Sequence, residues 1–325
     1  MKTKKKYFVT GGTGFIGSHL IQKLLKKDHQ VVALARNLKK AEPLKAMGVE
    51  LAFGDITDRS TLKKPMQGVD GIFHLAAWYK IGVDSSPAEP VNVKGTENVL
   101  TTMQELNIPK GVYTSTLAVN SDTDGQIVDE TYRFQGQHLS AYDKTKWKAH
   151  YEVAVPLIRQ GLPLIIVLPG LVYGPGDTSQ LGELLQQAVK GKLNILPGGR
   201  TGVCWSHIQN IVQAHLLAME KGTPGETYII AGPCHTYHKG FKTAGQVTGQ
   251  KIRALWIPPW LMRMMSRVMS IIEKIIPVPA TFSAEAMRVT AGITYYGDNS
   301  KAKRELGYTP RSLEQGLRDT FVNKK

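Results

Sequence analysis

Tyr142 and Lys146 have the side-chain types and the spacing of a pair that moves a proton. They lie four residues apart in Ala141-Tyr-Asp-Lys-Thr-Lys146, which we expect to be helical, so both side chains would share one face. A free phenol has a pKa of about 10, and a neighbouring ammonium lowers that pKa because it favours the phenolate. The pair would suit interconversion of an alcohol and a carbonyl, although such a pair alone is common by chance.

A hydroxyl at the end of a predicted strand supports a catalytic role for the Tyr142–Lys146 pair. Thr116 follows a predicted strand over 112–114, with Ser115 beside it. Ligands of open α/β sheets bind at the carboxyl ends of the strands, so a hydroxyl there could hydrogen-bond the substrate oxygen. The alternative role for the hydroxyls of Ser115 and Thr116 is to cap the loop by hydrogen bonds to its backbone. Because the chain also carries a glycine loop at residues 10–17, we favour Thr116, Tyr142 and Lys146 as the catalytic residues.

The glycine loop Thr10-Gly-Gly-Thr-Gly-Phe-Ile-Gly17 follows the first predicted strand and opens a helix. Gly11, Gly14 and Gly17 suit, in turn, a tight turn, close approach of the backbone to a pyrophosphate, and close packing of helix on strand. The helix N-terminus adds free N–H groups and a partial positive charge for phosphate oxygens. In this strand–turn–helix context the loop predicts a dinucleotide site.

The end of the second predicted strand indicates which dinucleotide binds. An acidic residue here would bind the ribose 2′-hydroxyl of NAD, but the chain has Arg36, with Lys39 and Lys40 just beyond. A guanidinium matches a 2′-phosphate through paired charged hydrogen bonds. We therefore predict NADP. If Arg36 is only a solvated surface charge, NAD stays open.

The elements that would position these residues alternate along the first half of the chain. Near-continuously apolar runs are typical of buried parallel strands, and strands that alternate with helices predict an α/β fold with a doubly wound parallel sheet of the Rossmann type. The expected strands are 7–10, 31–35, 50–53, 71–75, 112–114 and 164–168, and the expected helices are 15–27, 59–67, 90–106 and 140–159.

The second half has shorter elements, expected over 182–190, 208–220 and 228–231. We expect a dinucleotide-binding domain over 1–170 and a smaller α/β substrate-binding lobe over 171–325, interleaved with the end of the sheet. A helix over 261–276 carries Met and Ile at helical spacing. Packing on the second lobe is the first interpretation of this helix; an adaptable lid over an apolar substrate and contact with a membrane surface are the alternatives.

Composition narrows the class of protein. The chain has 325 residues, 42% of them hydrophobic, and a formal net charge of +15; dispersed lysines without a nucleic-acid motif favour a basic surface over nucleic-acid binding. The two cysteines, Cys204 and Cys234, match neither a metal site nor a disulfide framework, and no acidic or histidine cluster has ligand spacing. We expect no metal, no secretion signal, no membrane span and a cytoplasmic protein.

Taken together, the motifs resemble the extended short-chain dehydrogenases/reductases of the epimerase/dehydratase superfamily, and most of all its dihydroflavonol reductase-like branch. The resemblance covers nearly the whole chain. Thr116, Tyr142 and Lys146 match the family's catalytic residues, and Gly54–Asp58, His74–Ala77, Val91–Asn98 and Leu168–Pro175 match other landmarks. The implied cofactor contacts are Gly11, Thr13, Gly14, Phe15, Ile16, Gly17, Arg36, Asp55, Ile56, Leu75, Ala76, Ala77, Tyr142, Lys146, Pro169, Leu171 and Val172. The resemblance also implies a homodimer through the helices at 90–106 and 140–159.

Departures from the family pattern bear on the reaction. Many sugar-modifying relatives carry Arg where Leu168 stands, Asp where Asn210 stands, and Tyr-Gly in the segment that here reads Val119-Asn-Ser121. Ser115 and Leu117 flank Thr116 where sugar dehydratases usually place acids. These differences favour simple carbonyl reduction over nucleotide-sugar chemistry.

Three functions are compatible with these motifs. The leading prediction is an NADP-dependent reductase of an aldehyde or ketone, whose small-molecule substrate could be apolar, with Trp78, Tyr79, Lys80, Tyr173, Arg200, Trp205 and His207 as residues within reach of the pocket. For any one of these residues, packing in the core is the more common role. The alternatives are an epimerase or dehydratase that keeps its cofactor, and a non-catalytic NADP-binding sensor.

Overall fold

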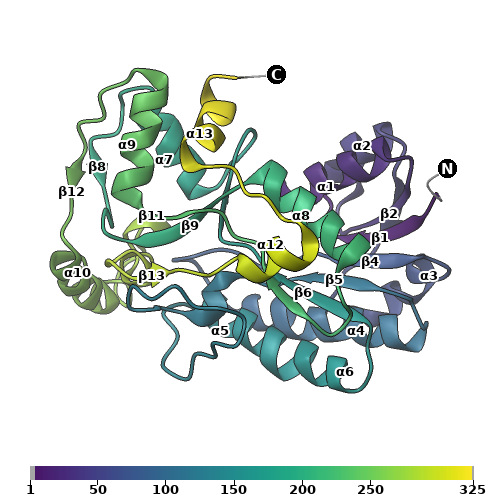
Figure 1. Cartoon of the computed structure of the whole chain (residues 1–325). Helices are drawn as coiled ribbons and strands as arrows, with labels where there is room; N and C mark the ends of the chain where they lie inside the picture. The colour runs from purple at the N-terminus through teal and green to yellow at the C-terminus, as the bar shows by residue number, and fades with distance from the viewer. Residues whose placement is uncertain (1–3, 324–325) are drawn as a thin grey trace.

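A seven-stranded parallel sheet forms the centre of the computed structural model, which describes residues 4–323 (Figure 1). Its order is β10-β6-β5-β4-β1-β2-β3, and every neighbouring pair is parallel. The order reverses between β1 and β4, which creates the crevice where ligands bind in such sheets. The strands are β1 (Lys6–Thr10), β2 (Gln30–Ala35), β3 (Glu50–Phe53), β4 (Gly71–His74), β5 (Gly111–Thr114), β6 (Leu164–Leu168) and β10 (Thr227–Ile229).

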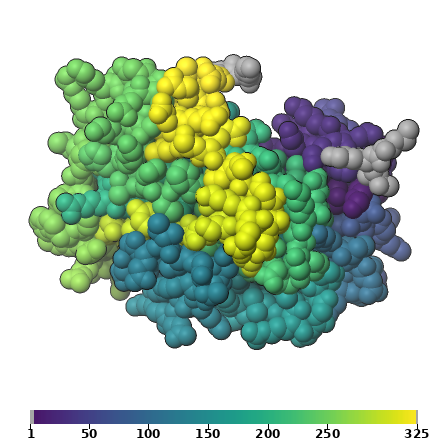
Figure 2. All heavy atoms as spheres, viewed as in Figure 1, coloured from purple at the N-terminus to yellow at the C-terminus, as the bar shows by residue number. Residues whose placement is uncertain are grey.

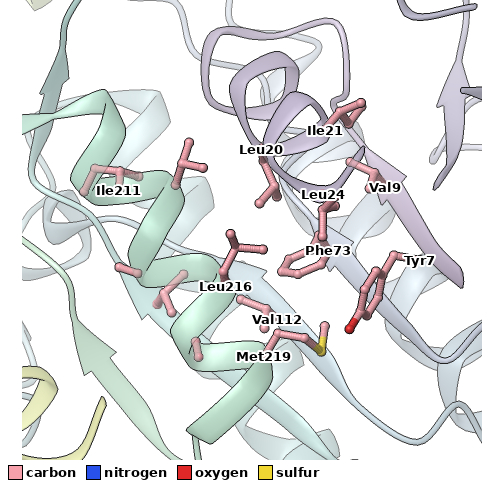
Figure 3. Packing of buried hydrophobic residues seen from close by; sticks show 14 of the residues in the cluster. Tyr7, Val9, Leu20, Ile21, Leu24, Phe73, Val112, Ile211, Leu216 and Met219 are labelled. Carbon is pink, nitrogen blue, oxygen red and sulfur yellow. The ribbon is translucent and has the colours of Figure 1, made fainter. Parts of the chain in front are cut away.

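Helices cover both faces of this sheet, so neighbouring residues of one strand enter different cores. Val9 of β1 joins a cluster with residues of α1 (Phe15–Lys26) and α8 (Ile208–Lys221), shown in Figure 3. Phe8 enters a second cluster with residues of α4 (Gly95–Glu105), on the opposite face. Burial on both faces explains why the strands read as continuous apolar runs.

The predicted strands and helices of the first half are present, with small differences. The expected helix 59–67 is split into a 3₁₀ turn, Arg59–Thr61, and a short α3, Lys63–Met66, because Pro65 lacks the N–H that a continuous helix needs. The expected helix 90–106 begins with a π-helical turn, Pro90–Lys94, and continues as α4. The expected helix 140–159 comprises α5 (Ala141–Lys148), a π-helical turn (Ala149–Ala154) and α6 (Val155–Arg159).

A second lobe is built around β9 (Gly202–His207). This strand pairs with β7 (Leu171–Tyr173), β11 (Cys234–Thr236) and β13 (Thr294–Tyr295). Its buried Trp205 packs in a cluster with residues of three helices. Those helices are α7 (Gln180–Val189), α9 (Tyr237–Thr248) and α13 (Leu313–Phe321), and a small sheet of β8 (Ile195–Leu196) and β12 (Leu255–Trp256) lies at the edge of the lobe.

The chain crosses between the lobes more than once. β10 lies between segments of the second lobe in the sequence but pairs with β6 at the edge of the first sheet. Near the C-terminus, α12 (Ser300–Leu306) packs on α8 and β10, and α13 packs on α9. These C-terminal helices run over the surface of both lobes (Figure 2). The remaining helices are α2 (Leu38–Ala46), α10 (Pro259–Ile272) and α11 (Ala284–Val289).

Cys204 and Cys234 form a disulfide that their spacing did not predict. They stand directly opposite each other in the pairing of β9 with β11, with Cα atoms 3.9 Å apart. Sequence spacing carries no information on such a strand pairing. Among residues 4–323, no helix is long and apolar enough to cross a membrane, and no three metal-ligating side chains cluster as a metal site would require.

Candidate active site

The glycine loop joins β1 to α1 in a turn that only small residues fit. Gly11 has φ of 73°, and the Gly14 N–H donates to its carbonyl oxygen over 3.0 Å. A Cβ on Gly17 would collide with that same carbonyl. The exposed Thr13 and Gly14 precede α1, whose first residue is Phe15, and no side chain caps the helix. The free N–H groups at this end suit phosphate oxygens.

The ends of β1 and β4 are fixed to each other beside the loop. The Thr10 hydroxyl bonds His74 Nδ1 over 2.7 Å and accepts the Ala76 N–H over 3.2 Å. Burial, with Lys146 nearby, lowers the pKa of His74 to about 3, so the ring is neutral. The predicted cofactor residues Leu75 and Ala76 are half-buried here and Ala77 is exposed. This rim lies where the strand order reverses.

Arg36 and Asp55 lie together just beyond the ends of β2 and β3. The Arg36 side chain is 70% exposed, and its guanidinium is 3.6 Å from the Asp55 carboxylate. A contact this open contributes little to stability and leaves the guanidinium accessible to a phosphate. Ile56 differs from its neighbours, because its side chain is 5% exposed and packs in the core under the sheet. The Ile56 side chain is therefore taken up by core packing, and its contact with a cofactor stays a prediction.

Thr116 and Tyr142 meet at the carboxyl ends of the central strands. Thr116 follows β5, and its oxygen caps the 3₁₀ turn Leu117–Asn120 by accepting the Ala118 N–H over 3.2 Å. Burial raises the pKa of Tyr142 well above its usual value, and Tyr79 raises it further, while a hydrogen bond with the Thr116 side chain partly opposes the rise. At neutral pH the phenol is protonated, so it can donate a proton.

Lys146 lies behind this pair, with partners other than the predicted one. Its ammonium donates to the Tyr113 hydroxyl over 2.8 Å and to the Thr114 carbonyl over 2.9 Å. The side chain is 2% exposed, and burial lowers its pKa to about 7. The groups that shift the pKa of Tyr142 do not include Lys146, so the expectation that Lys146 lowers this pKa stays a prediction.

Neighbouring polar residues fix the backbone around the site. The Asn92 amide accepts the Trp78 N–H over 2.7 Å, donates to the Trp78 carbonyl over 3.1 Å, and donates to the Thr145 hydroxyl over 2.9 Å. This ties the loop after β4 to α5. Ser115 bonds His150 over 2.9 Å inside the core, which gives Ser115 a structural role.

Two carboxylates that the sequence did not single out hold the first turn of α5. Asp143 is 3% exposed and accepts the Tyr295 O–H over 3.1 Å, and burial raises its pKa to about 7. Glu285 of α11 accepts the Gly82 N–H over 2.8 Å and the Ala141 N–H over 2.7 Å. Glu285 is far from both partners in the sequence, so no local pattern could have predicted the contact.

The remaining candidates divide between the site and the core. The Tyr79 ring meets the Tyr142 ring edge-on, with centroids 4.8 Å apart, and 55% of Tyr79 is exposed. Tyr173 and Trp205 are buried in the core of the second lobe, as expected for packing residues. His207 caps α8 through the Gln209 N–H and is 4% exposed. Lys80 and Arg200 are exposed.

The segment after β6 completes the rim. The Pro169 carbonyl accepts the Leu117 N–H over 3.1 Å, which places the segment against the turn that begins at Thr116. Leu171 and Val172 are half-buried in β7. The glycine loop, the residues after β4, Thr116 and this segment therefore follow the carboxyl ends of β1, β4, β5 and β6, and Tyr142 of α5 meets Thr116 there.

Comparisons with known proteins agree with this architecture. The model for the NAD dependent epimerase/dehydratase family matches residues 7–231. A relative from Synechocystis sp., named "Putative dihydroflavonol 4-reductase", is 31% identical over 96% of this chain and 92% of its own length. A ketoreductase of 4-hydroxy-2-methyl-3-oxo-4-farnesyl-3,4-dihydroquinoline-1-oxide from Stigmatella aurantiaca is 29% identical over 95% of this chain and 94% of its own.

A solved structure shares the fold over almost the whole length. The DesIV dTDP-glucose 4,6-dehydratase from Streptomyces venezuelae, with NAD bound, has a TM-score of 0.75 and 25% identity, covering 97% of this chain and 95% of its own. The shared fold thus holds a nicotinamide dinucleotide in that protein.

Proposed function

The chain belongs to the NAD-dependent epimerase/dehydratase family of short-chain dehydrogenases/reductases, and within it we propose an NADP-dependent reductase of an apolar ketone or aldehyde. It is an oxidoreductase, and we propose reduction as its reaction because two of its relatives are named as reductases. The observation that carries it is the meeting of Thr116 with a protonated Tyr142 at the carboxyl edge of the sheet.

The glycine loop and the start of α1 suit a dinucleotide in their lack of side chains and in their hydrogen-bond donors. A Cβ on Gly11 or Gly17 would fill the cradle against neighbouring backbone, and the uncapped start of α1 offers N–H groups to a pyrophosphate. Thr13, Gly14, Phe15 and Ile16 would line that part, and the Arg36 guanidinium would pair with a 2′-phosphate. When bound, the nicotinamide supplies the hydride.

The residues of the chain would supply the proton and the orientation. Because its pKa is raised, Tyr142 carries a proton that it can donate to the oxygen of a carbonyl as that oxygen gains negative charge. Thr116 would hydrogen-bond the same oxygen and orient it. The Tyr113 hydroxyl and the Thr114 carbonyl hold Lys146 behind the phenol. When Lys146 is protonated, it would place a positive charge there.

Tyr142→Phe tests the catalytic assignment. We expect turnover to fall by about 10²- to 10⁴-fold, the usual contribution of one acid–base group, while NADPH binding measured by fluorescence changes little. Tyr132→Phe removes a hydroxyl from the loop between β5 and α5 and serves as the matched control. Full activity in Tyr142→Phe would refute the assignment.

Arg36→Ala tests the cofactor. Loss of a charged hydrogen-bond donor to the 2′-phosphate should raise KM for NADPH by about tenfold and leave KM for NADH unchanged. An unchanged ratio of the two KM values would remove the preference for NADP.

The apolar character of the substrate has two supports. Tyr79 offers a largely exposed aromatic ring beside Tyr142, and the Stigmatella relative is named for a farnesyl-bearing ketone. A panel of aldehydes, ketones and thioesters of increasing chain length, assayed by NADPH oxidation, tests this class. We expect kcat/KM to rise with apolar length; a flat profile would exclude the class.

An epimerase or dehydratase is the second candidate, favoured by the similarity to a sugar-nucleotide dehydratase. Such an enzyme would purify with tightly bound nicotinamide and would turn over without added cofactor. We further expect a homodimer through α4 and the helix from α5 to α6, which light scattering of the purified protein would test.

A further inference from the structure

Helix α10 carries an apolar stripe on its outer side. Trp260, Met264, Val268, Ile271 and Ile275 follow one another at intervals of four, four, three and four residues, so they lie along one line of the helix and its C-terminal extension. They are 65%, 50%, 50%, 64% and 78% exposed, respectively. A row of large apolar side chains in water indicates a surface that contacts something else.

The other side of the same helix is already covered. Met262, Met265 and Met269 pack against Met287 of α11 and its neighbour Ala291, and the Ser266 hydroxyl donates to the Ala284 carbonyl over 2.8 Å. The first interpretation from the sequence, packing on the second lobe, is thus correct for one face only. The stripe faces away from that packing, and α10 lies at the outer edge of the molecule (Figure 1).

A basic row runs beside the stripe. Arg263, Arg267 and Lys274 each precede a stripe residue by one position, and all three are exposed. Glu273 is the one acid between residues 259 and 276, and it is turned toward α11, where it accepts the Ala284 N–H over 3.0 Å. The outward surface therefore combines apolar and cationic groups, and the one acid of this segment, Glu273, is bonded to Ala284.

We propose that α10 docks the protein on the surface of a membrane that contains anionic lipids. The stripe would enter the boundary between headgroups and acyl chains, and Arg263, Arg267 and Lys274 would contact lipid phosphates. Trp260 at the start of the helix is the residue type that prefers this boundary. A second copy of α10 would offer the same basic row against a single acid, Glu273, which is already bonded to Ala284, so charge complementarity favours anionic lipid over self-association.

The docked helix is connected to the substrate side of the candidate active site. α10 packs on α11, whose Glu285 holds both Gly82, in the loop that carries Tyr79, and Ala141, at the start of the helix that carries Tyr142. A membrane beneath α10 would therefore lie next to the loops through which an apolar substrate enters. The docking itself requires no turnover, so it stands independently of the proposed reaction.

Flotation of the full chain with phosphatidylcholine vesicles, with and without phosphatidylglycerol, tests the proposal. We expect binding to the anionic vesicles that weakens at high ionic strength. Arg263→Gln combined with Arg267→Gln should weaken binding by about fivefold for each cation removed. Ile271→Gln combined with Ile275→Gln should weaken it roughly ten- to hundredfold, because two apolar side chains no longer leave water. Ile127→Gln, at a similarly exposed isoleucine outside α10, is the matched control and should bind as the parent does.

Three results would overturn the proposal. The parent protein could remain unbound to phosphatidylglycerol vesicles, or the Ile271→Gln, Ile275→Gln variant could bind as tightly as the parent. The third is a parent dimer that this variant converts to monomer in size-exclusion chromatography without any vesicle binding, which would make the stripe an interface between copies. NADPH oxidation with a water-soluble ketone should be equal in all variants. Inactivity of every protein, parent included, would refute the proposed reaction and leave the vesicle result intact.

Discussion

Asp143→Asn should make the protein more stable, and the gain should grow with pH. The Asp143 carboxyl is 3% exposed at the start of α5, and its pKa is raised from 3.8 to about 7, mainly by burial and further by Glu285. Hydrogen bonds from Ser140 and Tyr295 oppose the rise only in part. The folded protein therefore holds a proton that the unfolded chain releases.

The sign and the size of the effect follow from linkage. A group whose pKa is raised by folding contributes its full stability below the unfolded value, 3.8, and loses that contribution as pH rises through the folded value of about 7. The interval corresponds to about 4 kcal/mol as an upper bound, at about 1.4 kcal/mol for each pH unit. Asn keeps an acceptor for the Tyr295 hydroxyl and never ionises, so the variant avoids this loss.

Urea unfolding of the parent and the variant, at pH values from about 5 to 8, measures the difference. Histidines with lowered pKa, such as His74 and His150, affect both proteins equally and cancel. The free-energy difference should increase in favour of Asp143→Asn up to about pH 7 and then level off. Asp124→Asn, at an exposed aspartate, is the control. A difference that stays constant over this range would refute the reasoning.

Three further substitutions test the local geometry. Gly17→Ala places a methyl group against the Gly11 carbonyl, and should lower stability by about 1–3 kcal/mol and abolish NADPH binding in a fluorescence titration. Ser121→Gly relieves a φ of 50° with ψ of −145°, a region that favours glycine, and should raise the free energy of unfolding by about 1 kcal/mol; a loss would contradict the strain. Asn92→Ala removes the hydrogen bonds to Trp78, and should cost about 2–4 kcal/mol in urea unfolding and lower kcat; a neutral effect would show that the loop is held by other contacts.

The sheet was predictable because its physical signal is local. Strands such as Leu164–Leu168 are apolar at every position, since both of their faces are covered. Helix α2 was missed because Pro43 and several lysines hide its pattern. The strands of the second lobe were missed because they are two to six residues long and are defined by partners distant in sequence, as β9 is by β13.

The motifs of the candidate site are visible in the sequence, whereas its electrostatics are not. Glycine spacing and the four-residue interval from Tyr142 to Lys146 are visible in the chain. The hydrogen-bond partner of Lys146 is not visible, because Tyr113 reads as one more apolar residue of a strand. Its hydroxyl nevertheless accepts a hydrogen bond from the Lys146 ammonium. Burial then sets the pKa values of Tyr142 and Lys146, and burial depends on the whole fold.

The late position of β10 sets an order on synthesis. While the ribosome is still making residues before 227, the emerging β6 has no outer neighbour and presents a row of open N–H and C=O groups. Only after Ile229 has left the exit tunnel can β10 pair with β6 and complete the sheet. On the outer side of β10, Glu130 then accepts the Ile229 N–H over 2.8 Å. During much of its translation, the nascent chain therefore exposes the unpaired edge of β6, to which another chain could pair. Fragments that end near residue 170 should aggregate where the whole chain does not.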